Sequence, residues 1–417
     1  MSAAFVRGAC PGLSAPMQTG DGLLVRLTPK GPIATDAFLA LCARARRHGN
    51  GVMEITPRGN IQVRGLSAPS APLFAAAVDA LQIASTCRVP LMTDPLDGLG
   101  ALIDTSNFAA EIAQAIEDRQ LALAPKISVA IDGGGPLHLD DIAADIRLRA
   151  VVSEGERRLH VAVGGDARRA RALGMAAPAD AADVLLRLLE VIARRGPRAR
   201  ARDILNDEGL APFKSAIADR LETAPDLRVR SAAEPIGLHP LRNGRLALGI
   251  ALAFGQADAE ALARLATMSR DHGADALRPA AGRALLVLGL DEKGAERVTI
   301  AAERLGFITH ADDPRRAIAA CAGKPACASA WLATRPIAAA VAERLPHSAG
   351  GTMLHISGCP KGCAQPAPTA LTIVGDARGA GILRNASAAA TPLRYVDPDD
   401  LIAEIASLLQ IAEVAHD

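Results

Sequence analysis

Aromatic residues are scarce in this chain of 417 residues. They make up 2% of it, with one Trp, one Tyr and seven Phe. Because half of the residues are nevertheless hydrophobic, the cores must be filled by Leu, Ile, Val and Ala. A chain of this length usually forms about two to four domains.

An excess of charge of either sign is also missing. The 46 Lys and Arg and the 45 Asp and Glu leave a net charge of +1, which argues against a general nucleic-acid-binding or anionic-membrane surface. No apolar run approaches the roughly 18–20 residues that span a bilayer, and the opening MSAAFVRGACPGLSAPM lacks the apolar region of a secretory signal. We therefore expect a soluble, cytoplasmic protein without a nucleic-acid or membrane partner.

The chain contains a two-copy repeat. Residues 23–66 predict a strand, a helix that ends at Gly49 and a strand pair, and residues 245–290 predict the same order. Aligning His48-Gly49 with His272-Gly273 brings the two closing Gly-Leu pairs into register within one residue. A repeat of about 220 residues with two copies is no solenoid and indicates a duplicated pair of domains.

Each half should hold a small α+β unit followed by a larger one. The larger unit of the first half contains three strand candidates and the helix AADVLLRLLEVIARR. The joint between the halves is predicted near 221–235. The predicted domains are 12–86, 87–230, 236–300 and 301–395, followed by a C-terminal helix over 396–417.

Four of the seven cysteines are concentrated in the second of the larger units. Cys10, Cys42 and Cys87 are scattered. The clustered ones are Cys321, Cys327, Cys359 and Cys363, with the spacing C-x5-C, 31 further residues and C-x3-C. In a reducing compartment such a cluster favours metal binding over disulfides.

Four thiolates are the usual ligands of a [4Fe–4S] cluster. A structural zinc site is the alternative, but its pairs usually have tighter C-x2–4-C spacing; buried free thiols or disulfides are a third. Cys327 is predicted to open a helix that begins near Ala326, whose N-terminus would stabilise thiolates. Gly358 and Gly362 would let the backbone wrap around an inorganic core.

The second cysteine pair, in S-G-C-P-K-G-C, together with the first pair and the repeat, resembles the sulfite and nitrite reductase family of sirohaem enzymes. The resemblance covers residues 12–395. It implies an α+β fold of duplicated nitrite/sulfite reductase architecture, in which each half has a small ferredoxin-like unit and a larger α+β unit.

Within this family the chain resembles the precorrin-3B synthases. The residues that carry this resemblance are H-x-S-G-C-x-K-G-C from His355 onward, the opening RGACPGLSAPMQTGDGLLVRL and the segment DDPRRAIAACAGKPACASA. It implies an O₂-dependent monooxygenase of aerobic cobalamin biosynthesis, which converts precorrin-3A to the hydroxylactone precorrin-3B. It also implies a separate mononuclear non-haem iron in addition to the cluster. The alternatives are a sirohaem-dependent sulfite or nitrite reductase and a non-catalytic electron carrier.

The resemblance also indicates residues that would bind the carboxylates of a tetrapyrrole. They are Arg58, Gln62, Arg88, Lys126 and Lys361. Two positions depart from the reductases, because Ser128 stands where they have a second lysine and Lys361 where they have asparagine. Loss of a lysine weakens a cationic pocket for small anions, whereas a polycarboxylate suits guanidinium forks. Arg278 and Arg283 are the counterparts in the repeat.

Two further predictions concern metal and electrons. His239 and His355 are the candidate iron ligands; alternatively, His239 positions a loop and His355 donates a hydrogen bond to cluster sulfur. No dinucleotide, flavin or P-loop signature is present, and Gly133–Gly135 predicts a turn. Electrons should therefore come from a separate reductase, with NAD(P)H as the indirect donor. The basic run 194–202 could dock an acidic carrier, although such runs usually face water.

Overall fold

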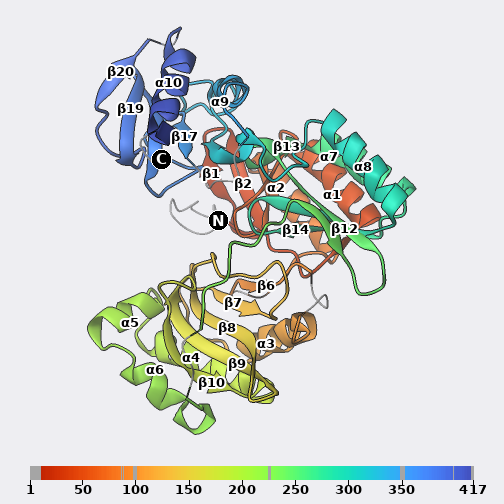
Figure 1. Cartoon of the computed structure of the whole chain (residues 1–417), viewed down its shortest axis with the longest axis vertical. Coiled ribbons are helices and arrows are strands. Elements are labelled where there is room, and N and C mark those ends of the chain that lie inside the picture. Colours follow the sequence, from red (N-terminus) through yellow and green to blue (C-terminus); the bar gives the residue numbers. More distant parts are fainter. Residues whose placement is uncertain are drawn as a thin grey trace.

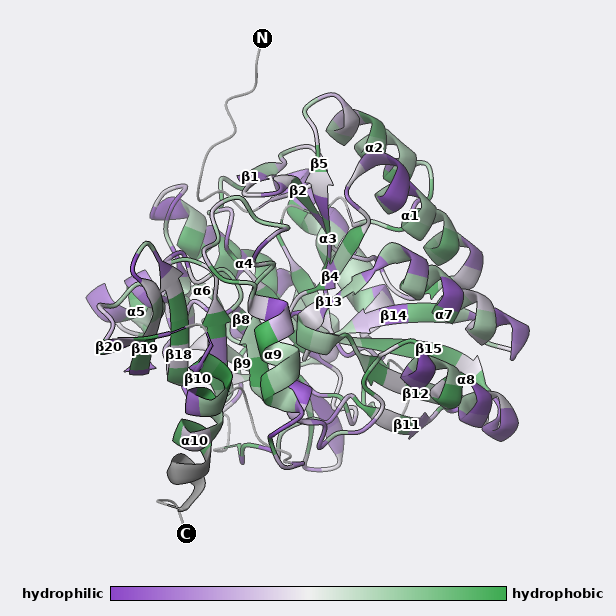
Figure 2. Cartoon of the chain, turned by 90° about the horizontal axis from the view of Figure 1, so that it is seen from above, coloured by the Kyte–Doolittle hydropathy of each residue, from purple (hydrophilic) through white to green (hydrophobic). Residues whose placement is uncertain are grey.

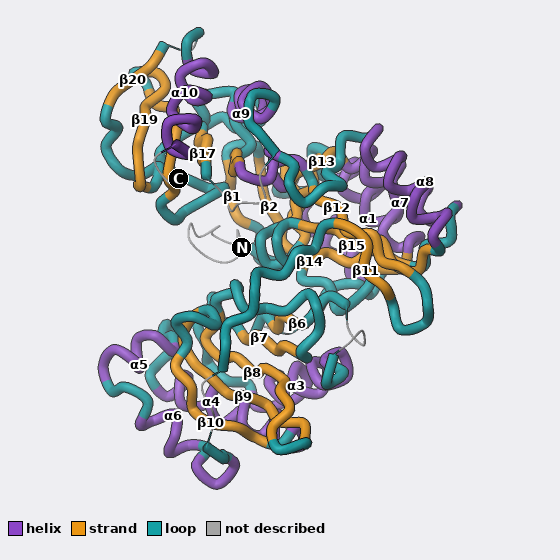
Figure 3. Tube along the Cα trace, in the orientation of Figure 1, coloured by secondary structure: helices purple, strands orange, loops and turns teal. Residues whose placement is uncertain are grey.

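The computed structural model describes residues 11–85, 87, 89–96, 101–223, 227–347, 353–397 and 399–414. Its elements form a central body, a second domain and a cysteine domain (Figure 1). The second domain lies on one side of the central body and the cysteine domain on another, and Figure 3 shows that loops connect the three parts.

The central body contains two five-stranded sheets. The strands of the first, in spatial order, are β1 (Met17–Thr19), β2 (Gly22–Leu27), β5 (Ile61–Leu66), β4 (Val52–Ile55) and β13 (Gln256–Asp258). Those of the second are β11 (Gly237–Pro240), β12 (Leu246–Ala251), β15 (Ala284–Leu290), β14 (Ala276–Ala280) and β3 (Ile33–Ala34). The helices are α1 (Thr35–His48), α2 (Ser70–Asp79), α7 (Ala259–Asp271) and α8 (Glu292–Arg304).

The two sheets exchange their edge strands. β13 belongs to the second half of the chain but pairs with β4, and β3 belongs to the first half but pairs with β14. The halves therefore share one core, in which Phe38 and Phe74 lie in the same apolar cluster as Leu262 and Val287. The small units of the two halves are joined into one body.

Periodicity explains the helices of this body. In α1 the buried residues Phe38, Leu41, Cys42 and Ala45 recur at helical spacing, and the helix ends before Gly49. α1, α7 and α8 lie side by side, and hydrophilic and hydrophobic residues alternate along them (Figure 2). Their apolar sides cover one face of each sheet, which leaves the other face of the first sheet for polar residues.

The second domain and the cysteine domain repeat one strand plan. The sheet of the second domain has β6 (Leu91–Thr93), β7 (Val129–Asp132), β8 (Ala144–Ser153), β9 (Glu156–Gly165) and β10 (Arg171–Ala176). The sheet of the cysteine domain has β16 (Ile318–Ala320), β17 (Leu354–Ser357), β18 (Thr369–Asp376), β19 (Gly379–Ala386) and β20 (Arg394–Val396). In each sheet the first three strands pair in parallel, and the fourth and fifth strands each pair antiparallel to the strand before them.

Helices cover both of these sheets. The second domain has α3 (Thr105–Arg119), α4 (Ala181–Arg194), α5 (Ala201–Asp207) and α6 (Ala211–Ala216), and the cysteine domain has α9 (Thr334–Ala342) and α10 (Leu401–Val414). Short 3₁₀ turns lie at Pro178–Asp180, Ala218–Arg220, Ala253–Gly255 and Pro314–Ala317. In the described part of the chain, no helix is both long and apolar enough to cross a membrane.

The duplicated α+β architecture is therefore confirmed, but the helix predicted at Cys327 is wrong. α9 begins at Thr334, and the backbone around Cys327 forms turns instead. Gly323 has a positive φ of 62°, and the N–H of Ala328 donates to the carbonyl of Gly20 in the turn between β1 and β2. This bond ties the segment to the central body, which prevents an early helix.

Candidate functional site

A row of four polar side chains crosses the first sheet. On β2, β5 and β4 the residues Val25, Val63 and Met53 point into the core, so alternate residues point to the opposite face. There the strand register places Arg26 opposite Gln62, Gln62 opposite Glu54, and Glu54 opposite Gln256. We call Arg26, Gln62, Glu54 and Gln256 the polar row.

Hydrogen bonds link the four side chains of the polar row to one another. With its amide oriented to satisfy both neighbours, Gln62 donates to Glu54 at 2.7 Å and accepts from Arg26 at 2.6 and 2.9 Å. The amide of Gln256 also donates to Glu54. Burial raises the pKa of Glu54 despite the nearby charge of Arg64. The row is a pre-formed polar surface whose side chains fix one another.

Arg64 lies on the same face and pairs with two carboxylates. Its Nε and Nη2 donate to Asp21 at 2.8 Å each, and its Nη1 donates to Glu54 at 3.2 Å. The three side chains are only 4–13% exposed. Burial alone would raise the pKa of Asp21, but the hydrogen bonds and charge of Arg64 outweigh it, and the pKa of Asp21 is lowered. Such forked contacts orient a guanidinium firmly.

The four cysteines of the cysteine site (Cys321, Cys327, Cys359 and Cys363) converge beside this face. The N–H of Gly358 donates to Sγ of Cys321 at 3.2 Å, which ties the first pair to the second. Burial and the other three thiols raise the pKa of Cys363. In the described chain all four cysteines are free of disulfide bonds.

The spacing of the four sulfurs does not match that required by a single tetrahedral ion. A tetrahedral zinc with bonds of about 2.3 Å would hold its sulfurs about 3.8 Å apart. Within the described residues, no three of these sulfurs lie within 4.8 Å of one another. A Cβ on Gly20 would lie 2.3 Å from Sγ of Cys327, so a glycine is needed where the chain passes the cysteine. Four separated thiols around a close-fitting backbone suit an Fe₄S₄ cube.

Several cationic side chains lie near the cysteine site, next to the buried carboxylates of Asp21 and Glu54. The segments 314–342 and 353–375 contain no Asp or Glu. Arg335 lies near Cys321, Glu54 and Arg64, and its buried Nε and Nη2 have no hydrogen-bond partner among the described residues. Lys361, between the second pair of cysteines, is exposed, and its Nζ donates to Ser329 at 2.9 Å. Positive charge favours thiolates and an anionic cluster.

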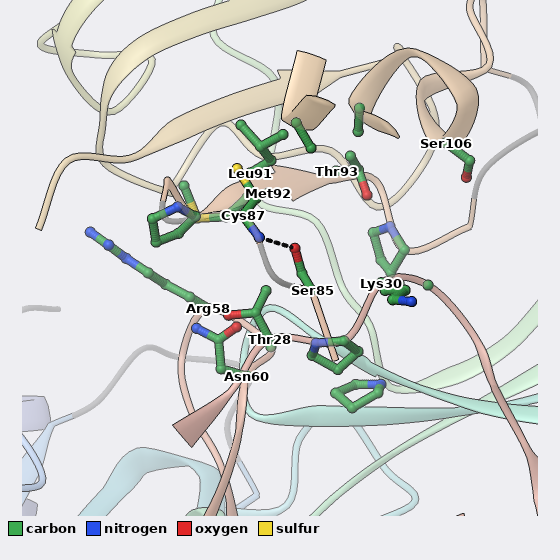
Figure 4. Close-up of a pocket in the computed structure, with 18 of the residues that line it drawn as sticks. Thr28, Lys30, Arg58, Asn60, Ser85, Cys87, Leu91, Met92, Thr93 and Ser106 are labelled. Carbon is green, nitrogen blue, oxygen red and sulfur yellow. Dashed lines mark hydrogen bonds between the residues drawn. The ribbon is translucent and has the colours of Figure 1, made fainter. Parts of the chain in front are cut away.

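A cleft of about 400 Å³ opens where the central body meets the second domain (Figure 4). Arg58, Thr28 and Asn60 lie together on one wall, and Leu91, Met92 and Thr93 lie opposite. Among the described residues that line it, Lys30, Arg58 and Arg278 are cationic and Glu117 is acidic. Arg58 donates to the carbonyl of Ala143 at 3.1 Å, and Arg278 donates to Oγ1 of Thr93 at 2.9 Å.

The cleft and the cysteine site are connected by one face of the first sheet. Asn60, Gln62 and Arg64 alternate along β5 and its approach, so all three point to that face. At about 3.3 Å per residue, Asn60 and Arg64 are about 13 Å apart. This face of the sheet therefore runs from the cleft to the cysteine site.

The structure brings together some of the predicted substrate residues and not others. Arg58 lines the cleft, and Gln62 lies in the polar row. Lys361 lies at the cysteine site. Lys126 is exposed in the turn before β7 and does not line the cleft. Arg88 lies outside the described residues.

Sequence reasoning missed the buried charges. Asp21, Glu54, Arg64 and Arg335 surround the cysteines but were not predicted. The signal was present in part, because Glu54 and Arg64 alternate with apolar residues along strands. A polar residue at every second position of a buried strand marks a face that contacts something other than the core.

One further cluster has metal-ligand residue types. Donor atoms of Asp132, His138 and Asp140 lie within 4.8 Å of one another. However, Arg230 pairs with both carboxylates, and its hydrogen bonds and charge lower the pKa of Asp140 to about 2 although burial works against this. Nε2 of His138 lies 2.8 Å from the carbonyl of Ser231, and its Nδ1 accepts from the N–H of Asp140. The ligand atoms are therefore already used.

The predicted iron ligands do not gather either. Nε2 of His239 lies 3.1 Å from the carbonyl of Pro235, as expected for a residue that positions a loop. In the described part of the molecule, neither His239 nor His355 belongs to a group of three ligand side chains. The ligands of a mononuclear iron stay unassigned.

The duplicated fold and the cysteine site define a protein of the nitrite and sulfite reductase class. The sequence model of the protein family described as the nitrite/sulfite reductase ferredoxin-like half domain matches residues 15–81. The structure of the NirA protein of Mycobacterium tuberculosis superposes with a TM-score of 0.72 at 18% identity, over 93% of this chain and 80% of that one, which shows the shared fold.

Relatives in sequence indicate which family within this class the chain belongs to. A ferredoxin–nitrite reductase of Synechococcus elongatus is 25% identical over 83% of this chain and 75% of its own length. A precorrin-3B synthase of Sinorhizobium sp is 40% identical over 97% of this chain and 89% of its own length. The chain belongs to the precorrin-3B synthase family.

Proposed function

We propose that this protein is an O₂-dependent monooxygenase that converts precorrin-3A to the hydroxylactone precorrin-3B in aerobic cobalamin biosynthesis. The observation that carries the proposal is the 40% identity with a precorrin-3B synthase across almost the whole chain. It is supported by four converging cysteines and by the cationic side chains that line the cleft. Its place would be the cytoplasm, where thiols stay reduced.

The cysteine site would hold a [4Fe–4S] cluster, which supplies electrons one at a time. The chain's own residues keep the site suitable for it. The N–H of Gly358 contacts Sγ of Cys321, and the positive charges of Arg64 and Arg335 favour the thiolate forms. Gly20 leaves room for Cys327.

The substrate would lie on the face that joins the cleft to the cysteine site. Precorrin-3A is a polycarboxylate, and guanidinium groups bind carboxylates with two hydrogen bonds at once. Arg58 and Arg278 would hold its rim in the cleft, and Lys361 would bind the edge near the cysteines. Gln62 would contact it from the polar row.

Two electrons are needed for each turnover. One oxygen atom of O₂ enters the substrate, and the other leaves as water with two electrons and two protons. A separate reductase that draws on NAD(P)H would supply the electrons, and a mononuclear non-haem iron is the proposed O₂ site.

A sirohaem-dependent sulfite or nitrite reductase is the second candidate, because nitrite reductases are among the relatives. Two residues count against it. Ser128 is buried in place of a lysine, so its position offers no cation to a small anion, and Lys361 replaces an asparagine. Sirohaem would give strong Soret and red absorption bands, whereas a lone cluster gives a broad brown shoulder.

The decisive experiment is a turnover with labelled oxygen. The anaerobically reconstituted protein is incubated with precorrin-3A, a reductant and ¹⁸O₂, and the product is analysed by mass spectrometry. The proposal predicts a hydroxylactone that carries one labelled atom. Unchanged precorrin-3A together with production of sulfide from sulfite, or of ammonia from nitrite, would establish the rival function.

A further inference from the structure

His355 in β17 is fully buried, and its two ring nitrogens lack hydrogen-bond partners within the described chain. Its exposed fraction is 0%, and neither ring nitrogen has a hydrogen-bond partner among the described residues. Buried polar groups in native proteins almost always have a partner. An imidazole in this position therefore indicates a partner other than the described part of the polypeptide.

The ring is directed at the cysteine loop. Its neighbours Leu354 and Ile356 lie in the apolar core of the cysteine domain, so His355 points to the opposite face of β17. A Cβ placed on Gly362 would lie 3.8 Å from Cε1 of His355. Because Cε1 stands between the two nitrogens, the polar edge of the ring faces the loop from Cys359 to Cys363.

Two polar side chains on this face, Ser357 and Thr372, are already engaged in hydrogen bonds. The hydroxyl of Ser357 donates to the carbonyl of Cys359 at 2.7 Å. Thr372, opposite His355 in the sheet, donates to the carbonyl of Ala386 at 2.8 Å. An imidazole ring has at least one N–H to donate, and the guanidinium of Arg283, whose charge acts on His355, cannot accept it.

We propose that His355 donates this N–H to a sulfur of the cluster held by Cys359 and Cys363, and so raises the reduction potential of the cluster. The inference rests on the proposed cluster. Reduction adds negative charge to the sulfurs, and a hydrogen bond to a more negative acceptor is stronger. His355 would therefore stabilise the reduced form and act as a positioning residue, without contact to the substrate.

The test is a potentiometric titration of the cluster, followed by EPR of the reduced state. His355→Leu removes the donor, and His355→Gln keeps one. Thr372→Val is the matched control. It removes a buried hydroxyl from the same face, but that hydroxyl donates to a backbone carbonyl of the protein. The expected result for His355→Leu is a reduced-to-oxidised ratio about tenfold lower at a fixed potential, which is 59 mV for one electron. The midpoint potentials of His355→Gln and Thr372→Val should stay close to that of the unmodified protein.

The outcomes separate the two proposals. If the unmodified protein holds no acid-labile sulfide, the cluster itself is refuted. If it holds the cluster and His355→Leu has the same midpoint potential, the role of His355 is refuted. If the Leu variant loses its cluster, pulsed EPR of protein labelled with [¹⁵N]histidine tests the hydrogen bond instead. A ¹⁵N coupling that is present in the unmodified protein and absent from His355→Gln supports the bond. If neither protein shows the coupling, the bond is refuted.

Discussion

Replacement of Arg64 by methionine tests whether the buried charges beside the cysteine site act as one unit. Arg64 donates two hydrogen bonds to Asp21 and one to Glu54, and these carboxylates are only 4% and 13% exposed. Without the guanidinium, two buried carboxylates lose their counter-charge. Removal of one partner from a buried ion pair costs about 3–5 kcal/mol. Asp21 keeps a hydrogen bond from Thr19, so we expect a loss of about 3 kcal/mol at pH 7.5.

The pH dependence has a defined sign. In the unmodified protein the pKa of Asp21 is lowered, so its contribution to stability is complete above its unfolded pKa and is lost as the pH falls through the folded pKa. Without Arg64, burial raises the pKa of Asp21 above the unfolded value, so its ionisation opposes folding as the pH rises. The difference between the two proteins should therefore be largest near neutral pH and shrink toward pH 4.

The assay is urea unfolding of the apoproteins, followed by far-UV circular dichroism at several pH values. Arg46→Met is the matched control. Arg46 pairs with Glu260 at 3.1 Å, but both side chains are more than half exposed, and such pairs contribute about 0–1 kcal/mol. If Arg64→Met at pH 7.5 costs no more than Arg46→Met, or if its cost grows on acidification, the buried network does not stabilise this face.

Three further changes test the site. Cys327→Ser should abolish iron and acid-labile sulfide in the reconstituted protein, whereas Cys42→Ala should leave both unchanged, because Cys42 lies in the core of the central body; equal iron contents would contradict the ligand assignment. Gly20→Ala should greatly reduce cluster incorporation, since its Cβ would lie 2.3 Å from Sγ of Cys327, and Gly12→Ala, which meets nothing within 4 Å, should not. Arg58→Met should raise the KM for the tetrapyrrole at least tenfold through loss of a charged hydrogen bond of about 1.5–3 kcal/mol, with the cluster spectrum unchanged; an unaltered KM would place the substrate elsewhere.

The repeated plan could be predicted from the sequence because its elements are long and periodic. The strands and helices expected over residues 23–66 and 245–290 are present as β2, α1, β4 and β5, and as β12, α7, β14 and β15. The four cysteines could be selected by spacing alone. For the repeat, the local pattern agrees with the tertiary structure, so its elements could be predicted. The ligand role of the four cysteines stays a prediction.

The rest depends on contacts between distant segments. β3 has two residues and β13 has three, which is too short for any periodic signal, so the exchange of edge strands is invisible before the sheets are assembled. The helix predicted at Cys327 fails because a bond to Gly20, some 300 residues earlier, holds that segment in turns. Buried nitrogens of His355 and Arg335 that lack a partner within the described chain likewise become apparent only once burial is known.

The exchange of edge strands has a consequence for synthesis of the chain. Gln256, the last member of the polar row, lies on β13, so this surface is incomplete until more than half of the polypeptide has left the ribosome. Before that moment the N-terminal half presents the bare edge of β4 to the cell, and such edges invite association with other chains. The same duplication that gives the enzyme two similar halves thus makes each half dependent on the other, and a nascent chain interrupted between them should be a client for chaperones.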